Sequence, residues 1–188
     1  MGCGGYVGGK PALEHYKDGL FGDPRITTWT RGQPAEVFWA SGANHMGGYA
    51  YRLCKVNKGK FWKVTEKCFN KGHLNFYGGV IKDDFYDDIN IILAGDTTWI
   101  DMDARRGEMT ENTWEARELV TTTEGTTPEG SMWAKLTIGR PNKGQYFAFK
   151  DLVEVPEDLE PGEYVLSFRW DCLHTPQVWS ACSNILVQ

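Results

Sequence analysis

The chain has 188 residues, of which 41% are hydrophobic and 24% are charged, and its formal net charge is −5 at pH 7. This length suits one domain with a full core, so we expect a single domain over residues 1–188. The acidic balance, with a pI near 5.4, gives no reason to expect nucleic-acid binding. The mean hydropathy of −0.45 predicts a soluble protein. No apolar run approaches the length that spans a membrane.

The first residues carry two weak signals. Residues 1–5 have neither the basic start nor the apolar run of a signal peptide. Residues 4–10 fit the first part of a phosphate-binding loop, Gly-x-x-x-x-Gly-Lys, but Pro11 stands where Ser or Thr should hold magnesium. We therefore interpret this stretch as glycine-rich coil.

Short segments rich in β-branched and aromatic residues recur along the chain between Gly and Pro turns. The clearest is 164–170, in which every second residue from Tyr164 to Trp170 shares one face. Apart from a short helical turn at 12–16, no helix is expected. The pattern predicts an all-β fold, an antiparallel β-sandwich of the immunoglobulin or fibronectin type with long loops. The other predicted strands are 26–29, 36–40, 49–53, 74–80, 89–93, 97–100, 118–123, 132–138, 146–154 and 185–187.

Two charged stretches are predicted to be loops. Residues 55–67 are basic, with no strand or helix pattern. Residues 83–88 are acidic, and a calcium-binding loop is the alternative there. The glycine and the terminal glutamate of an EF-hand are absent, so a solvated loop is favoured.

His45 stands in the segment Asn-His-Met-Gly-Gly, directly before the predicted strand 49–53. A glycine pair lets the backbone turn tightly or approach another group closely. His45 is therefore expected at the end of a sheet, where its side chain can face outward. Imidazole is the commonest protein ligand of transition metals. A surface histidine without a function is the alternative.

The segment before the last predicted strand combines polar and aromatic residues. Gln177 and Trp179 are two positions apart, so they share a face if the backbone is extended. His174 lies just before them, and a loop histidine without a function is again the alternative.

Both segments resemble lytic polysaccharide monooxygenases. The motif NHMGGY at 44–49, followed by YRLC at 51–54, is similar to their internal-histidine segment. The likeness is to insect-type members and to chitin-binding type-4 proteins of algae and oomycetes. The motif QVWSAC at 177–182 resembles the Gln-x-aromatic-x-x-Cys pattern of their final hairpin. With residues 123–126 and 163–166, the likeness covers about half of the chain.

The resemblance implies a copper "histidine brace". His45 would be its second imidazole, because the first ligand in that family is the mature N-terminal histidine. Trp179 would occupy the axial side of copper, where the family usually has Tyr or Phe. Tryptophan cannot ligate through oxygen, so it could only shield that side. Gln177 would hydrogen-bond near bound oxygen, and His174 would stand where fungal members carry an oxygen-side histidine, although the loop is shorter here. Gln177 and Trp179 are thus expected beside His45 in space.

The cysteines predict two local disulfides. Cys54 and Cys68 flank one short span, and Cys172 and Cys182 flank another. Each bond would contribute about 2–4 kcal/mol, as in a secreted protein. Cys3 is left over and is expected to be unpaired in this chain. The absent signal peptide, the absent brace histidine and this leftover cysteine fit one cause, namely a missing N-terminal segment.

The resemblance implies a secreted, monomeric, copper-dependent oxidoreductase if the N-terminal histidine is restored. It would cleave glycosidic bonds of a chitin- or cellulose-like polysaccharide with electrons from an external donor. The alternative is a non-catalytic carbohydrate-binding module on the same fold, which would use flat aromatic rings to stack on sugars. A hydrolase is disfavoured because no paired carboxylates stand in a convincing setting. No nucleic-acid or membrane partner is expected.

Overall fold

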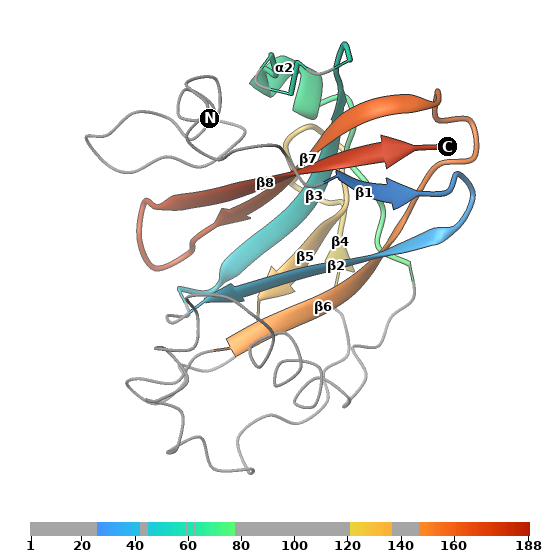
Figure 1. The fold of residues 1–188 in the computed structure, drawn as a ribbon. Coiled ribbons are helices and arrows are strands. Elements are labelled where there is room, and N and C mark those ends of the chain that lie inside the picture. Colours follow the sequence, from blue (N-terminus) through green and yellow to red (C-terminus); the bar gives the residue numbers. More distant parts are fainter. Residues whose placement is uncertain (1–25, 42–44, 59, 62, 78–120, 137–146) are drawn as a thin grey trace, which may run out of the picture.

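A computed structural model describes residues 26–41, 45–58, 60–61, 63–77, 121–136 and 147–188 (Figure 1). These described residues form strands and one four-residue helix, which is too short to cross a membrane. The elements are β1 (Ile26–Trp29), β2 (Pro34–Ser41), β3 (Gly47–Lys55), α2 (Glu66–Phe69), β4 (Thr121–Thr122), β5 (Trp133–Leu136), β6 (Phe147–Glu154), β7 (Gly162–Asp171) and β8 (Val178–Val187).

The strands form two sheets. A six-stranded sheet has the order β1-β8-β7-β3-β5-β4, and the pair β2-β6 faces it (Figure 1). The predicted all-β sandwich is therefore confirmed. One detail differs, because β1 pairs with β8 in parallel while the other pairs are antiparallel. The large sheet is mixed because the first and the last described strands run side by side in the same direction.

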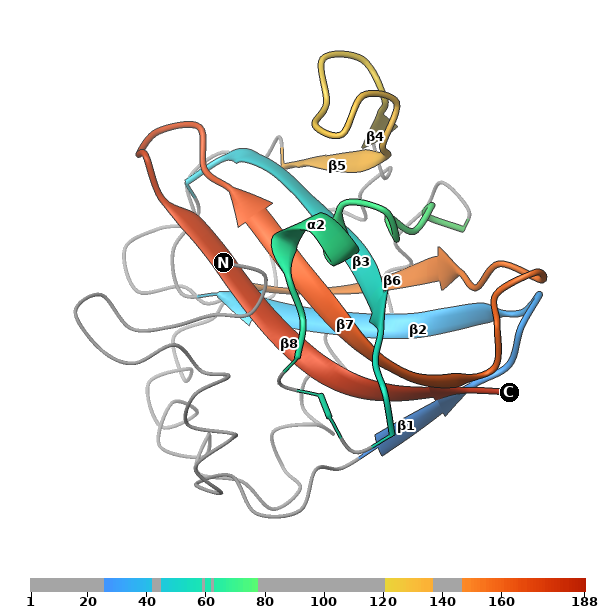
Figure 2. The ribbon, with the colours of Figure 1, turned by 90° about the horizontal axis from the view of Figure 1, so that it is seen from above.

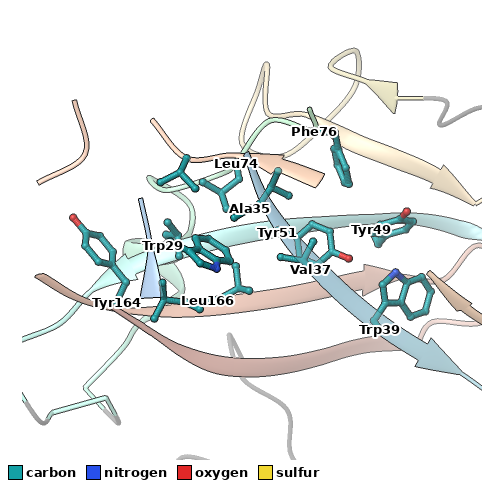
Figure 3. Packing of buried hydrophobic residues seen from close by; sticks show 14 of the residues in the cluster. Trp29, Ala35, Val37, Trp39, Tyr49, Tyr51, Leu74, Phe76, Tyr164 and Leu166 are labelled. Atoms are coloured by element: carbon teal, nitrogen blue, oxygen red, sulfur yellow. The ribbon is translucent and has the colours of Figure 1, made fainter. Parts of the chain in front are cut away.

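The core lies between the two sheets and follows the period of two (Figure 3). Tyr49, Tyr51 and Leu53 of β3 face it from the large sheet, as do Tyr164, Leu166 and Trp170 of β7. Val37 and Trp39 of β2 meet them from the opposite side. The inward face predicted for 164–170 is confirmed, with Phe168 partly buried against the same cluster.

A second apolar cluster covers the other face of the large sheet, where α2 lies (Figure 2). Phe61 and Phe69 are 3% and 0% exposed there and pack with Val165 of β7. The predicted Cys54–Cys68 disulfide is present, with 5.4 Å between the Cα atoms. Helix α2 was not predicted, because it is a single turn and leaves no periodic pattern. Its N-cap is Thr65, whose side chain accepts a hydrogen bond from the Cys68 N–H.

Some predicted elements differ from the structure. The described part of 74–80 is not a strand, since that region makes only the isolated bridges Arg52↔His73 and Phe76↔Val153. The described part of 118–123 contains only the two-residue β4. The last strand begins at Val178 instead of residue 185, because it pairs with β7 along its whole length. The predictions for 12–16, 83–88, 89–93 and 97–100 lie outside the described residues.

Candidate functional site

His45 lies directly before β3 and against the loop that joins β7 to β8. Its carbonyl oxygen accepts hydrogen bonds from the backbone N–H groups of Leu173 and His174, both at 3.1 Å. The two segments singled out in the sequence are thereby joined at one end of the sandwich, although most of the chain separates them. We call this end, formed by His45 and residues 171–179, the hairpin site.

Gly47 permits this close approach of the two backbones. Its φ is +99°, and a Cβ atom there would lie 2.0 Å from the carbonyl oxygen of Asp171. Only glycine adopts this φ freely and lacks the Cβ atom that would collide with Asp171. The expectation that the glycine pair brings the backbone close to another group is therefore confirmed at Gly47.

Trp170 supports the His45 ring. The two ring centroids are 5.9 Å apart with an interplanar angle of 28°, which is a stacked arrangement. The Trp170 indole N–H donates a hydrogen bond of 2.9 Å to the carbonyl oxygen of Met46. Trp170 is 2% exposed, so this buried ring fixes both the imidazole and the backbone beside it. Sequence reasoning placed Trp170 in the core but missed its contact with His45.

Trp179 lies directly opposite Trp170 in the β7–β8 ladder. Opposite residues of an antiparallel pair project from the same face, so the two indoles are neighbours in register. Trp179 is 52% exposed, whereas Trp170 is buried. His45 and Trp179 thus share Trp170 as a neighbour, and the predicted proximity of their own rings stays a prediction.

Gln177 and His174 have exposed side chains in the same loop. The Gln177 side-chain oxygen accepts a hydrogen bond of 3.2 Å from the Thr175 hydroxyl, and its carbonyl oxygen accepts one of 3.1 Å from the Cys172 N–H. The structure brings both residues to the loop that contacts His45. Their expected roles beside copper-bound oxygen stay predictions.

The predicted Cys172–Cys182 disulfide is wrong. Cys172 is a free cysteine, and Cys182 is disulfide-bonded to a partner outside the described residues. The register explains the error, because Cys182 lies opposite Ser167, five positions before Cys172 on the neighbouring strand. At about 3.4 Å per residue the two Cα atoms are roughly 17 Å apart, whereas a disulfide tolerates only about 7 Å.

Arg169 fixes the end of β7 that contacts Gly47. Its Nε and Nη2 donate to the two carboxylate oxygens of Asp171 at 2.6 and 2.9 Å, and its Nη1 donates to Glu66 at 3.0 Å. The hydrogen bond with Asp171 raises the pKa of Arg169, so this forked pair stays charged. Sequence reasoning missed Arg169. The sequence signal that could have found it is its position, because Arg169 falls on the outward face of the alternating pattern 164–170.

Two imidazoles belong to the hairpin site. Imidazole suits copper, and the His45 ring nitrogens have no hydrogen-bond partner among the described residues. However, no group of three or more His, Cys, Asp and Glu side chains in the described ranges could hold a metal ion. Burial raises the pKa of the Cys172 thiol, which keeps it protonated and a poor ligand. The imidazoles of the hairpin site therefore fit copper, but as part of a larger set of ligands.

Comparisons with known proteins return few matches. No protein-family profile matches the chain. No curated protein matches it either. Among solved structures, the fold is similar to a lytic polysaccharide monooxygenase AA15 from Thermobia domestica in the Cu(I) state, with a TM-score of 0.46 and 14% sequence identity. The match covers 89% of this chain and 66% of that chain. At this level of similarity, activity has to be argued from the residues of the site itself.

Proposed function

We propose that the hairpin site is a polysaccharide-acting copper site and that the protein is a secreted oxidoreductase of the lytic polysaccharide monooxygenase type. One observation carries the proposal, namely the pair of hydrogen bonds from Leu173 and His174 to the His45 carbonyl. These bonds join the two sequence segments that resemble that family. A chance likeness of two unrelated segments would not require them to meet in the fold.

In this proposal each residue of the hairpin site has one role. His45 supplies an imidazole to the metal, and the Trp170 ring holds that imidazole in place. Trp179 would wall off one side of the metal site, while Gln177 and His174 would donate hydrogen bonds beside it. Copper would supply the one-electron chemistry with oxygen or peroxide, and the electrons would come from an external donor. Further ligands would have to come from outside the described residues.

Exposed apolar side chains surround the loop and support a polysaccharide as the substrate. Leu173, Val178 and Trp179 are 71%, 53% and 52% exposed. Trp179 carries the flat ring among them, and a flat exposed indole suits the face of a sugar ring. The disulfide Cys54–Cys68 is typical of proteins outside the reducing cytosol, which fits secretion.

Copper titration tests the metal part of the proposal. We expect His45→Ala to weaken copper(II) binding at least about tenfold in calorimetry, because it removes a ligand, and to change the nitrogen pattern of the copper EPR spectrum. The matched control is His73→Gln, which changes a histidine after α2 that forms an isolated bridge with Arg52 of β3. Equal affinity in the wild type and His45→Ala would overturn the assignment of His45 as a ligand.

Product analysis tests the activity. Incubation of the copper-loaded protein with chitin or cellulose and ascorbate should release oxidised oligosaccharides, detected by mass spectrometry, and His45→Ala should not release them. The second candidate is a metal-independent carbohydrate-binding module, which the exposed Trp179 ring favours. In that case the protein would bind the polysaccharide equally well after EDTA treatment, Trp179→Ala would lose binding, and no oxidised product would form.

A further inference from the structure

A basic segment stands apart from the hairpin site. Within residues 55–71 six lysines are exposed, in a chain whose net charge is −5. We call this segment the lysine loop. Its lysines are Lys55, Lys58, Lys60, Lys63, Lys67 and Lys71. The function proposed above uses none of them.

The one acidic residue of the lysine loop is already paired with two arginines. Glu66 accepts hydrogen bonds from Arg52 at 2.5 Å and from Arg169 at 3.0 Å, and the Arg52 side chain is buried. Burial acts to raise the pKa of Glu66, but its hydrogen bond and charge interaction with Arg52 outweigh burial and lower it, so Glu66 is ionised at neutral pH. Its negative charge is therefore neutralised by the two guanidinium groups and does not offset the charge of the exposed lysines.

Five of the six lysines have no carboxylate partner among the described residues. Lys55 pairs with Glu160 at 2.5 Å. Among the residues that the structure describes, Lys58, Lys60, Lys63, Lys67 and Lys71 make no ion pair. Uncompensated like charges repel one another, so holding them together on one segment costs stability unless an anion offsets them.

The lysine loop is held on the sheet at several points. The Cys54–Cys68 disulfide closes most of it, and Phe61 and Phe69 are buried beneath it. Because the loop is anchored in this way, little conformational entropy is lost when its lysines bind a ligand. Lys55 ends β3, whereas His45 precedes its first residue, so the nine-residue strand separates the start of the lysine loop from the hairpin site by roughly 30 Å.

We propose that the lysine loop binds an anionic polysaccharide, one that carries carboxylate or sulfate groups, at a surface separate from the hairpin site. Lysines are compact, strongly hydrated point charges that suit a flexible chain of spaced anions. Single-stranded nucleic acid would call for exposed rings on which bases stack, and a membrane surface would call for exposed apolar side chains. Phe61 and Phe69 are buried, so these two rings are not available for stacking or for a membrane surface.

Affinity electrophoresis through gels that contain polygalacturonate or dextran sulfate, with neutral dextran as the comparison, tests this inference. The wild type should be retarded by the two anionic polymers, and less so as salt increases, because binding releases counterions. Lys60→Gln/Lys63→Gln should raise the apparent Kd at least about tenfold at low salt and reduce the slope of log Kd against log salt by roughly two. The matched control, Arg31→Gln/Lys135→Gln, removes the same charge from exposed positions elsewhere and should behave like the wild type.

Each other outcome would overturn the inference. Equal retardation of the wild type and the lysine-loop variant would show that these lysines do not take part in binding. An equal loss of retardation in both double variants would show that only the net charge of the protein matters. Tighter binding to an oligothymidylate or to anionic phospholipid vesicles at the same salt would replace the polysaccharide with another partner. His45→Ala should keep the retardation in full, so failure of the copper proposal is distinguishable from failure of this one.

Discussion

Asp151 is a carboxylate buried between the two sheets, with 3% of its surface exposed. The hydroxyl groups of Tyr49 and Tyr51 donate to its two oxygens at 3.2 and 2.9 Å, so it links β6 to β3 across the core. Burial raises the pKa of Asp151 to about 6, although the two tyrosine hydrogen bonds act to lower it. Burial likewise raises the pKa of Tyr51, which therefore remains a donor.

This carboxylate predicts a pH dependence of stability. The folded state holds the Asp151 proton up to a pH of about 6, whereas the unfolded chain releases it near 3.8. The free energy of unfolding should therefore decrease as the pH rises from about 4 to about 6, by about 3 kcal/mol from this residue, and should not change further above that range. Urea unfolding of the wild type and Asp151→Asn from pH 4 to 7 isolates the effect, because other carboxylates cancel in the comparison.

The free energy of unfolding of Asp151→Asn should increase relative to that of the wild type as the pH rises. Asp158→Asn, at an exposed position in the turn after β6, is the control and should parallel the wild type. A constant difference between Asp151→Asn and the wild type across this range would contradict the prediction.

For single residues, the sequence predicted which segments form the hairpin site better than it predicted the contacts that fix their side chains. His45, Gln177 and Trp179 were expected at one end of the fold, and their segments do meet there. The stacking of His45 on Trp170 was not foreseen, because a pattern with a period of two says which face a side chain occupies but not what approaches from a loop.

Among the elements, the turn into β3 depends on one glycine. Gly47→Ala would place a Cβ atom 2.0 Å from the Asp171 oxygen at a φ of +99°, so the β7–β8 loop would have to move. We expect a loss of at least about 3 kcal/mol in the free energy of unfolding, measured with urea. Gly130→Ala, at a φ of +77° with nothing within 4 Å, carries backbone strain alone and should cost only about 1 kcal/mol. Equal losses in both variants would contradict the close contact at Gly47.

The cysteines predict a specific peptide map. The sequence holds five of them, and in the structure Cys54 is bonded to Cys68 while Cys172 is free. A non-reducing digest should therefore contain one free thiol, at Cys172. The peptide of Cys182 should be recovered linked to that of Cys3, the one cysteine left, which would reverse the expectation that Cys3 is unpaired. A peptide that links Cys172 to Cys182 would instead restore the pairing first expected from the sequence.

Strand patterns were predictable where large apolar side chains alternate toward the core, as in β7 and β3, because alternation then marks the core face. The parallel pairing of β1 with β8 and the ten-residue length of β8 were not, since partner and register depend on contacts across the sheet. The unknown extent and register of β8 also led to the wrong disulfide prediction. With β8 taken to begin at residue 185, Cys182 seemed to stand in a loop beside Cys172, whereas it lies within the strand.

At the scale of the whole molecule, β3 has different chemistry at its two ends. The hairpin site, with His45 and exposed apolar groups, lies before its first residue, and the lysine loop follows its last residue. The large sheet carries the core on one face and α2 on the other (Figures 1 and 2). His45→Ala and Lys60→Gln/Lys63→Gln change side chains before and after β3, which is why the two proposals can fail independently.

The position of β8 between β1 and β7 has a consequence for biosynthesis. While the ribosome is making the chain, β1 has to wait for β8, the last of the described strands, and β7 presents an open edge until β8 has emerged. The large sheet therefore closes only after residue 187 has been added. Until then the nascent protein exposes two strand edges that other chains can pair with, and chaperone supply should determine how much of it is recovered in soluble form.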